Sequence, residues 1–101
     1  MYDIKNLAKL KRLDEKNPET MKAFWAFDKA AFARGAIDAL NKQLMAVAVA
    51  LTTQCPYCIA LHLKSARNAG ATDQVLAETA TVAAAMRAGA AIMHATHLFQ
   101  D

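Results

Sequence analysis

Apolar residues recur at helical spacing along nearly the whole chain, whereas the apolar–polar alternation of a half-buried strand is missing. In residues 4–13, for example, Ile4, Leu7, Ala8 and Leu10 share one side of a helix and lysines occupy the other. Glycine occurs three times and proline twice, and each falls at a plausible helix boundary. The pattern predicts an all-α fold with short connections.

The capping residues predict where the central helices begin and end. Asn17 and Pro18 have the residue types of an N-cap and a first helical position, with Gly35 as the expected stop. Asp38 is expected to cap a third helix that runs to about Thr53. Cys55-Pro56 repeats the cap-and-proline start for a fourth helix.

The last third of the chain predicts two further helices. The fourth helix is expected to run to about Asn68 and to end at Gly70, and Thr72 to cap a fifth helix near residues 73–86. Gly89 is expected to lie near a bend, followed by a last helix that carries His94 and His97. We therefore expect five to six helices in a single domain of residues 1–101.

Composition bounds the size of the core. The chain has 101 residues and 10.9 kDa, 24 of them alanine and only 7% aromatic. A compact monomer of this mass exposes about 5,600 Å² and buries about 65% of its unfolded surface. The 55% apolar content excludes disorder. A net charge of +3 is too mild to indicate nucleic-acid binding, so none is expected.

The third helix is apolar on every face from Leu44 to Leu51. Such a helix must be covered on every face, and the rest of a chain this short can scarcely do so, so we expect an oligomer. These eight residues are too few for a membrane span, which needs about twenty. The N-terminus carries no signal-peptide pattern, and we expect a cytoplasmic protein without membrane contact.

The segment that carries chemistry is Cys55-Pro56-Tyr57-Cys58, followed by His62. The first turn of a helix stabilises a thiolate, and i, i+3 spacing lets two sulfurs form a disulfide. His62 lies four residues after Cys58 on the same face, where it can accept or return a thiol proton. The position at the cap favours Cys55 as the attacking thiol, whereas the histidine favours Cys58. The residues themselves leave this choice open.

Two plainer interpretations compete with thiol chemistry. The cysteines could be small packing residues, or Cys55, Cys58 and His62 could bind zinc with a fourth ligand from His94 or His97. Three ligands within eight residues of one helix are unusual for structural zinc, and we expect no metal or cofactor. His94 and His97 are expected to be hydrogen-bonding or subunit-contact residues, and Tyr57 to shape access or pack against a neighbouring helix.

The sequence resembles the carboxymuconolactone decarboxylase/AhpD-like family over roughly residues 24–99. The resemblance is carried by five stretches in addition to His62: Asn41–Leu51, Cys55–Cys58, Ala69–Thr72, Met86–Ala91 and His94–His97. The Cys-x-x-Cys-x-x-x-His portion points to the AhpD-like side, because members on the decarboxylase side typically lack the cysteine pair.

This resemblance implies an all-helical subunit in a trimer or a hexamer of dimers, with a thiol-dependent antioxidant activity. It implies a hydroperoxide or disulfide substrate and a dithiol protein as reductant. It also implies that Cys58 attacks, that Cys55 closes the disulfide and that His62 belongs to a proton relay. The position of the glutamate usual in that relay is occupied by Gln43, which completes the candidate site.

An amide cannot carry a proton away at neutral pH, so the relay is either incomplete or filled by Glu78 or across a subunit contact. Two other functions stay open. One is a lyase on a lactone-like acid with His62 as general base. The other is a non-enzymatic oligomeric module whose thiols sense oxidation.

Overall fold

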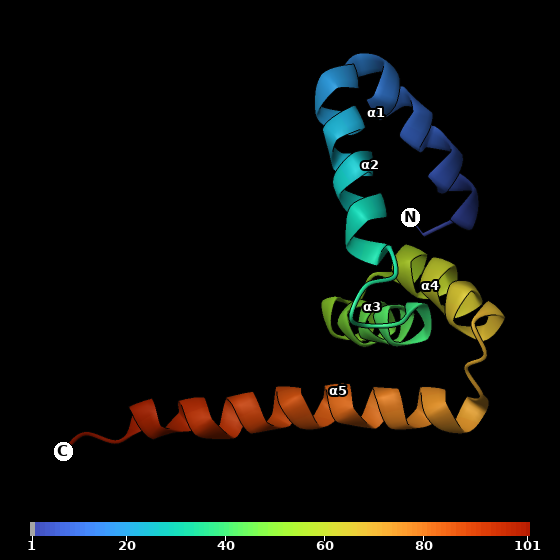
Figure 1. The fold of residues 1–101 in the computed structure, drawn as a ribbon. Coiled ribbons are helices and arrows are strands. Elements are labelled where there is room, and N and C mark those ends of the chain that lie inside the picture. Colours follow the sequence, from blue (N-terminus) through green and yellow to red (C-terminus); the bar gives the residue numbers. More distant parts are fainter. Residues whose placement is uncertain (1) are drawn as a thin grey trace.

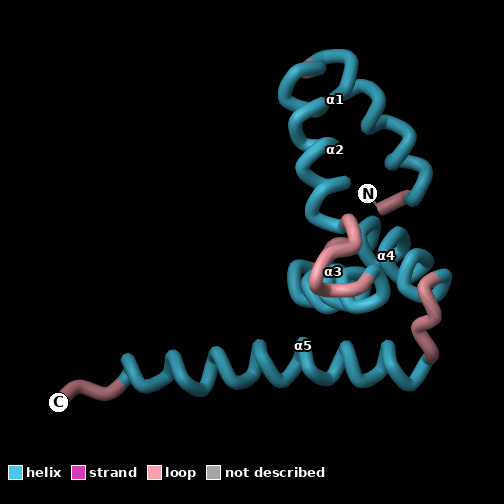
Figure 2. Tube along the Cα trace, viewed as in Figure 1, coloured by secondary structure: helices cyan, strands magenta, loops and turns pink. Residues whose placement is uncertain are grey.

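A computed structural model describes residues 2–101, and every regular element in that range is helical (Figures 1 and 2). In chain order the elements are the 3₁₀ helix η1 (Ile4–Lys9), α1 (Leu10–Lys16), α2 (Pro18–Phe32), α3 (Ala39–Thr53), α4 (Pro56–Asn68), α5 (Asp73–His94) and the 3₁₀ helix η2 (Ala95–Leu98). The all-α prediction with five to six helices is confirmed.

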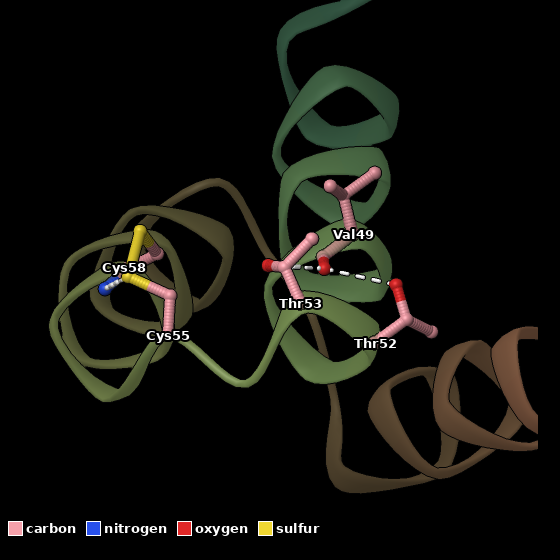
Figure 3. Close-up of a disulfide and its surroundings, with 5 residues drawn as sticks. All are labelled: Val49, Thr52, Thr53, Cys55 and Cys58. Atoms are coloured by element: carbon pink, nitrogen blue, oxygen red, sulfur yellow. Dashed lines mark hydrogen bonds between the residues drawn. A yellow bond between two sulfur atoms is a disulfide. The ribbon is translucent and has the colours of Figure 1, made fainter.

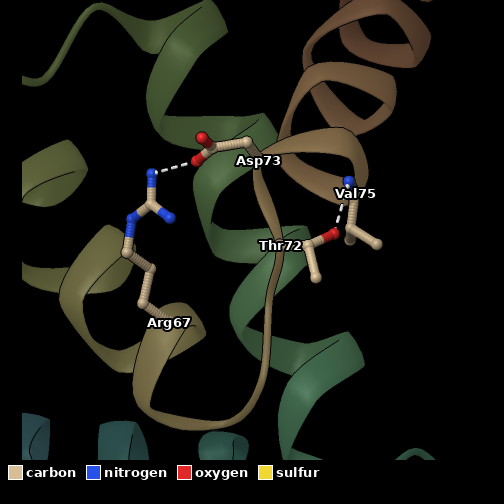
Figure 4. Close-up of polar contacts among 4 residues, drawn as sticks. All are labelled: Arg67, Thr72, Asp73 and Val75. Atoms are coloured by element: carbon tan, nitrogen blue, oxygen red, sulfur yellow. Dashed lines mark hydrogen bonds and ion pairs between the residues drawn. The ribbon is translucent and has the colours of Figure 1, made fainter.

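The predicted helix starts are confirmed by local hydrogen bonds. The Asp38 carboxylate accepts from the backbone N–H of Asn41 at 2.8 Å, at the start of α3. The Thr72 hydroxyl accepts from the N–H of Val75 at 3.2 Å, at the start of α5 (Figure 4). Each cap satisfies an amide that has no partner within its helix. These boundaries follow from sequence because the interactions span only three residues.

Two predicted boundaries were wrong. The bend expected at Gly89 is absent, and α5 continues through it to His94. Glycine costs a helix about 1 kcal/mol, but the alanines around Gly89 are the best helix formers and offset that cost. The second helix ends at Phe32 rather than at Gly35, since Ala33 already has an extended backbone conformation.

The helices form an open, L-shaped subunit rather than a layered bundle (Figure 1). In the middle, α3 packs against both α4 and α5. The α1–α2 hairpin rises on one side, and the C-terminal half of α5 extends away on another. The exposed ion pair between Arg67 and Asp73, at 2.7 Å, joins the end of α4 to the start of α5 (Figure 4).

The core of this subunit is smaller than the sequence predicts. Among the described residues, the buried apolar ones are Val47, Ala50, Ala66, Ala71 and Ala83. The accessible surface is 8125 Å², against about 5,600 Å² expected for a compact monomer. The radius of gyration is 17.1 Å, where about 13 Å is typical of this length. The single chain therefore leaves much of its apolar surface uncovered.

The C-terminal helix contributes several exposed apolar side chains to this surface, among them Val82, Met86 and Met93. The segment Asp73–Leu98 is long and apolar enough to cross a membrane by length and composition, although its unbroken apolar runs are short, and only 6% of its most apolar stretch is buried. The core helix of a soluble protein, which is mostly buried, passes the same test of length and composition.

A pair of glycine variants tests the turn between α4 and α5. Gly70 has a φ of +107°, which an L side chain rarely adopts, while Gly35 does not, and both have open space where a Cβ would lie. We expect Gly70→Ala to lower the free energy of unfolding by about 1–2 kcal/mol. Gly35→Ala should leave it unchanged or raise it by up to about 1 kcal/mol. Equal effects in urea unfolding would show that the turn is not constrained by its backbone.

Candidate functional site

The site begins at the junction between α3 and α4. The hydroxyls of Thr52 and Thr53 both donate to the Val49 carbonyl, at 3.0 and 2.9 Å (Figure 3). Gln54 then adopts a left-handed conformation, with φ of 57°, and the Cys55 N–H donates to the Ala50 carbonyl at 3.1 Å. These bonds satisfy carbonyls at the end of α3 and turn the chain sharply into α4.

The two cysteines occupy the first turn of α4 and form a disulfide (Figure 3). Their Cα atoms are 5.3 Å apart, within the range that a disulfide spans. Cys55 is the N-cap, and its sulfur accepts from the N–H of Cys58 at 3.2 Å. The helix end thus offers amide donors and a positive dipole to these sulfurs, the environment that favours a thiolate after reduction.

His62 lies one turn beyond Cys58, where two other helices hold its ring. Its Nδ1 is 2.8 Å from the Oε1 of Gln43 on α3. The ring of Phe32, at the end of α2, stacks on it with centroids 5.0 Å apart and planes inclined by 13°. An amide oxygen only accepts, so this contact places the imidazole proton on Nδ1 and leaves the Nε2 lone pair as the base.

Cys58 and His62 line one cavity of about 440 Å³ between α2, α3 and α4. Most of its other wall is apolar, with Phe32, Ile37 and Met45 among the contributors. One cysteine and the histidine that the sequence singled out therefore share a pocket large enough for a small organic molecule. Gln43 is not part of the cavity wall, but its side chain contacts His62, which is.

Lys42, which the sequence pattern does not single out, fixes α2 beside the cavity. Its ammonium donates to the carbonyl of Ala31 at 2.9 Å and to that of Ala33. Both carbonyls belong to the C-terminal end of α2, where a cation also meets the negative end of the helix dipole. The available signal is a lysine two residues before the apolar run Leu44–Leu51. By anchoring α2, Lys42 holds Phe32 over His62.

Tyr57, between the two cysteines, packs against the N-terminal segment. Its hydroxyl accepts from the Nδ2 of Asn6 at 2.9 Å, and its ring contacts that of Tyr2 edge to face at 4.8 Å. This confirms the expectation that Tyr57 packs against a neighbouring helix, here η1. The first residues of the chain thereby lie beside the turn that bears the disulfide.

Other residues considered from sequence lie away from this cavity. Glu78 is in a second groove, between α3 and α5, and accepts from the Nε2 of Gln74 at 3.0 Å. His94 and His97 contact each other, 4.8 Å between ring centroids, at the far end of α5. Within residues 2–101, no three His, Cys, Asp or Glu side chains converge as a metal site would require. Within one chain, therefore, Glu78 does not complete the relay, and the suggested zinc set is not assembled.

The fold and the disulfide-bearing helix define a helical protein with a thiol site, and its sequence identifies the family. The family described as "Carboxymuconolactone decarboxylase family" matches residues 18–101. The chain therefore belongs to the carboxymuconolactone decarboxylase family, as its motifs predicted. Residues 2–17, including the segment that contacts Tyr57, precede the matched region.

Two bacterial relatives illustrate how far the similarity extends. "Uncharacterized protein 4 in cox locus" of Paracoccus denitrificans is 58% identical over 73 residues, which are 72% of this chain and 66% of that protein. An uncharacterized protein of Cupriavidus necator is 34% identical over 83% of this chain and 74% of its own length. The chain thus spans about two thirds to three quarters of the length of these relatives.

Two solved structures share the fold. A carboxymuconolactone decarboxylase family protein from Legionella pneumophila, in its apo form, superposes with a TM-score of 0.75 and 34% identity over 89% of this chain and 80% of its own. A protein from Methanobacterium thermoautotrophicum has a TM-score of 0.80 and 36% identity over 85% of this chain and 97% of its own. The arrangement of helices around the cavity is therefore that of the family.

The tautomer of His62 can be measured directly. In ¹⁵N-histidine-labelled protein above neutral pH, we expect the His62 shifts to show Nδ1 protonated and Nε2 unprotonated. Gln43→Leu removes the acceptor, so the Nδ1–H population should fall. Gln74→Leu removes a glutamine amide far from the cavity and is the matched control. A Nε2-protonated ring in the wild type would mean that the Gln43 amide is turned the other way.

Proposed function

We propose that this protein is a thiol-dependent antioxidant oxidoreductase of the AhpD-like type, which reduces hydroperoxides or a partner's disulfide. The observation that carries the proposal is the Cys55–Cys58 pair, close enough to form a disulfide at a helix start, with Cys58 and His62 on the wall of one cavity. Proteins with and without enzymatic activity can share one fold. The site chemistry therefore bears the argument.

Cys58 is the attacking thiol in this proposal, because it lines the cavity together with His62 and Cys55 does not. His62 takes the Cys58 proton on Nε2, and the thiolate attacks one oxygen of the hydroperoxide. The O–O bond breaks, Cys58 becomes a sulfenic acid, and the alkoxide leaves as an alcohol after taking up a proton. The Cys55 thiol then attacks the sulfenic sulfur, which forms the disulfide and releases water.

The disulfide of the structure is then the oxidised end of this cycle. A dithiol protein returns it to two thiols through a mixed disulfide and becomes oxidised itself. Such reductants are maintained in reducing compartments, so we place the cycle in the cytoplasm. No metal or other cofactor is needed for these steps.

Gln43 sets the limits of this chemistry. The amide orients His62 but, being neutral, stabilises the imidazolium formed when the ring takes the thiol proton less than a carboxylate would. Phe32 on the ring face adds no formal charge either. The proton must then leave His62 to water or to the departing alkoxide, and we propose that this slows turnover with peroxides.

A lyase is the second candidate, favoured by the family's description and by a cavity that combines a histidine base with apolar walls. In that case His62 would abstract a proton from a small lactone-like acid and the cysteines would be bystanders. Replacing both cysteines by serine separates the two functions. A lyase survives this change, whereas the oxidoreductase does not.

Single cysteine variants test the proposed roles. When reduced protein meets a hydroperoxide in stopped flow, we expect the wild type to lose two thiols and form an intramolecular disulfide. Cys58→Ser should react at least a hundredfold more slowly, while Cys55→Ser should lose one thiol and accumulate a sulfenic acid that dimedone traps.

Reversed behaviour of the two variants would assign the attack to Cys55. Wild-type thiols that persist for minutes would reject peroxide chemistry. A disulfide that forms readily without turnover by any dithiol donor would instead indicate an oxidation sensor.

A single substitution at Gln43 tests the relay. We expect Gln43→Glu to raise peroxidase turnover several-fold near neutral pH, because a carboxylate at 2.8 Å from Nδ1 stabilises the imidazolium. The gain should be smaller in Gln43→Glu/His62→Asn, which lacks the ring. Turnover unchanged by Gln43→Glu alone would show that another group already accepts the proton.

A further inference from the structure

The residue between the two cysteines is held by the first residues of the chain. The Tyr57 hydroxyl accepts from Asn6, 51 positions away in sequence, and the Tyr57 ring meets that of Tyr2 edge to face. The N-terminus accordingly lies beside the start of α4 (Figure 1). Tyr57 is the second residue of α4, so these contacts act directly on the turn that bears the disulfide.

Residues 2–9, the N-terminal segment, are ordered by bonds of their own. The Asp3 carboxylate accepts from the N–H of Lys5 at 2.9 Å and caps η1, which continues into α1. The indole N–H of Trp25 on α2 donates to Asp14 on α1 at 2.7 Å and ties these two helices together. The segment therefore reaches Tyr57 as the end of a helical hairpin.

The N-terminal segment lies outside the part of the chain that matches the family, which begins at residue 18. The two cysteines, His62 and the other residues of the cavity wall all lie inside the matched part. The segment is therefore an addition that contacts the thiol site from outside. It can alter the properties of the site without supplying a reacting group.

A disulfide at a helix start is in equilibrium with a dithiol form in which the two sulfurs are free to separate. Few backbone bonds hold the first turn of a helix, so this turn opens more easily than the helix interior once the disulfide is reduced. An anchor on Tyr57 limits that opening and keeps each thiol near the other. It thereby raises the effective concentration of one thiol for its partner and favours the disulfide.

We propose that Tyr2 and Asn6 are positioning residues for the thiol pair: they hold Tyr57 and thereby lower the reduction potential of the disulfide. Reduction is an exchange in which a dithiol gives two electrons and two protons to the cysteines and becomes a disulfide itself. Because binding of the segment and formation of the disulfide are linked, reduction loosens the segment by the same factor. The inference rests on the proposed function only in treating the pair as a reversible couple.

The experiment measures the equilibrium between disulfide and dithiol protein in dithiothreitol or glutathione buffers of stepped ratio, with the free thiols trapped at each step. We expect Asn6→Leu and Tyr2→Ala to lower the equilibrium constant for disulfide formation at least threefold, which raises the reduction potential by about 14 mV. Tyr2→Phe keeps the ring contact and should keep the wild-type potential. Asn68→Leu makes the Asn6 substitution at the far end of α4 and should also match the wild type.

Hydrogen exchange on the wild type supplies a second measurement, which keeps the test decisive if a variant fails to fold. We expect reduction to raise the exchange rates of the segment amides at least threefold. The double variant Cys55→Ser/Cys58→Ser should show the faster rates with and without reductant. Wild-type potentials in both Asn6→Leu and Tyr2→Ala, or segment exchange independent of the redox state, would overturn the proposal.

The same measurements separate this proposal from the proposed function. A disulfide that no buffer reduces reversibly would reject both. A reversible couple whose potential is unchanged in the variants would reject the positioning role alone. Neither measurement needs peroxidase activity, so the positioning role is tested even if the thiols prove inert to hydroperoxides.

Discussion

The first turn of α4 is the feature on which the rest of the site depends. A helix start leaves amide N–H groups without backbone partners, and here the sulfur of Cys55 accepts from one of them. The same turn sets the i, i+3 spacing at which Cys58 meets Cys55, and one further turn sets His62. The left-handed residue Gln54 ends α3 directly before it, so both helices contribute to one junction. The pairing of the two cysteines and the position of His62 thus both follow from where α4 begins.

Tertiary structure then orients the side chains of this local motif. Gln43 on α3 and Phe32 on α2 fix the His62 ring from two directions, and Lys42 holds α2 in place by donating to its last carbonyls. Three consecutive helices therefore define the orientation of one imidazole. A neutral partner for His62 favours a base that accepts one proton over a relay that passes protons on. This distinguishes the site from one with a glutamate at that position.

Interactions within a few residues were predictable from sequence, and those that need a neighbour were not. Asp38, Thr72 and the Cys55-Pro56 start act over one turn, so their residue types alone located the helices. The bend predicted at Gly89 is absent because six nearby alanines favour the helix strongly enough to carry it through one glycine. Lys42 was overlooked since its acceptors, the carbonyls of Ala31 and Ala33, carry no sequence signal. The predicted core is larger than the observed one, because the scaling of surface area with mass assumes a compact chain.

An alanine-rich chain of this size forms helices easily but buries little apolar area, and the open subunit is the result. Alanine favours helices but buries little area, so the helices form readily and cover one another poorly. Part of the surface left over borders the thiol cavity, because Met45 and Val49 belong to both. Whatever covers that surface thereby also decides which molecules reach Cys58. Burial of apolar area and access to Cys58 are therefore linked through Met45 and Val49.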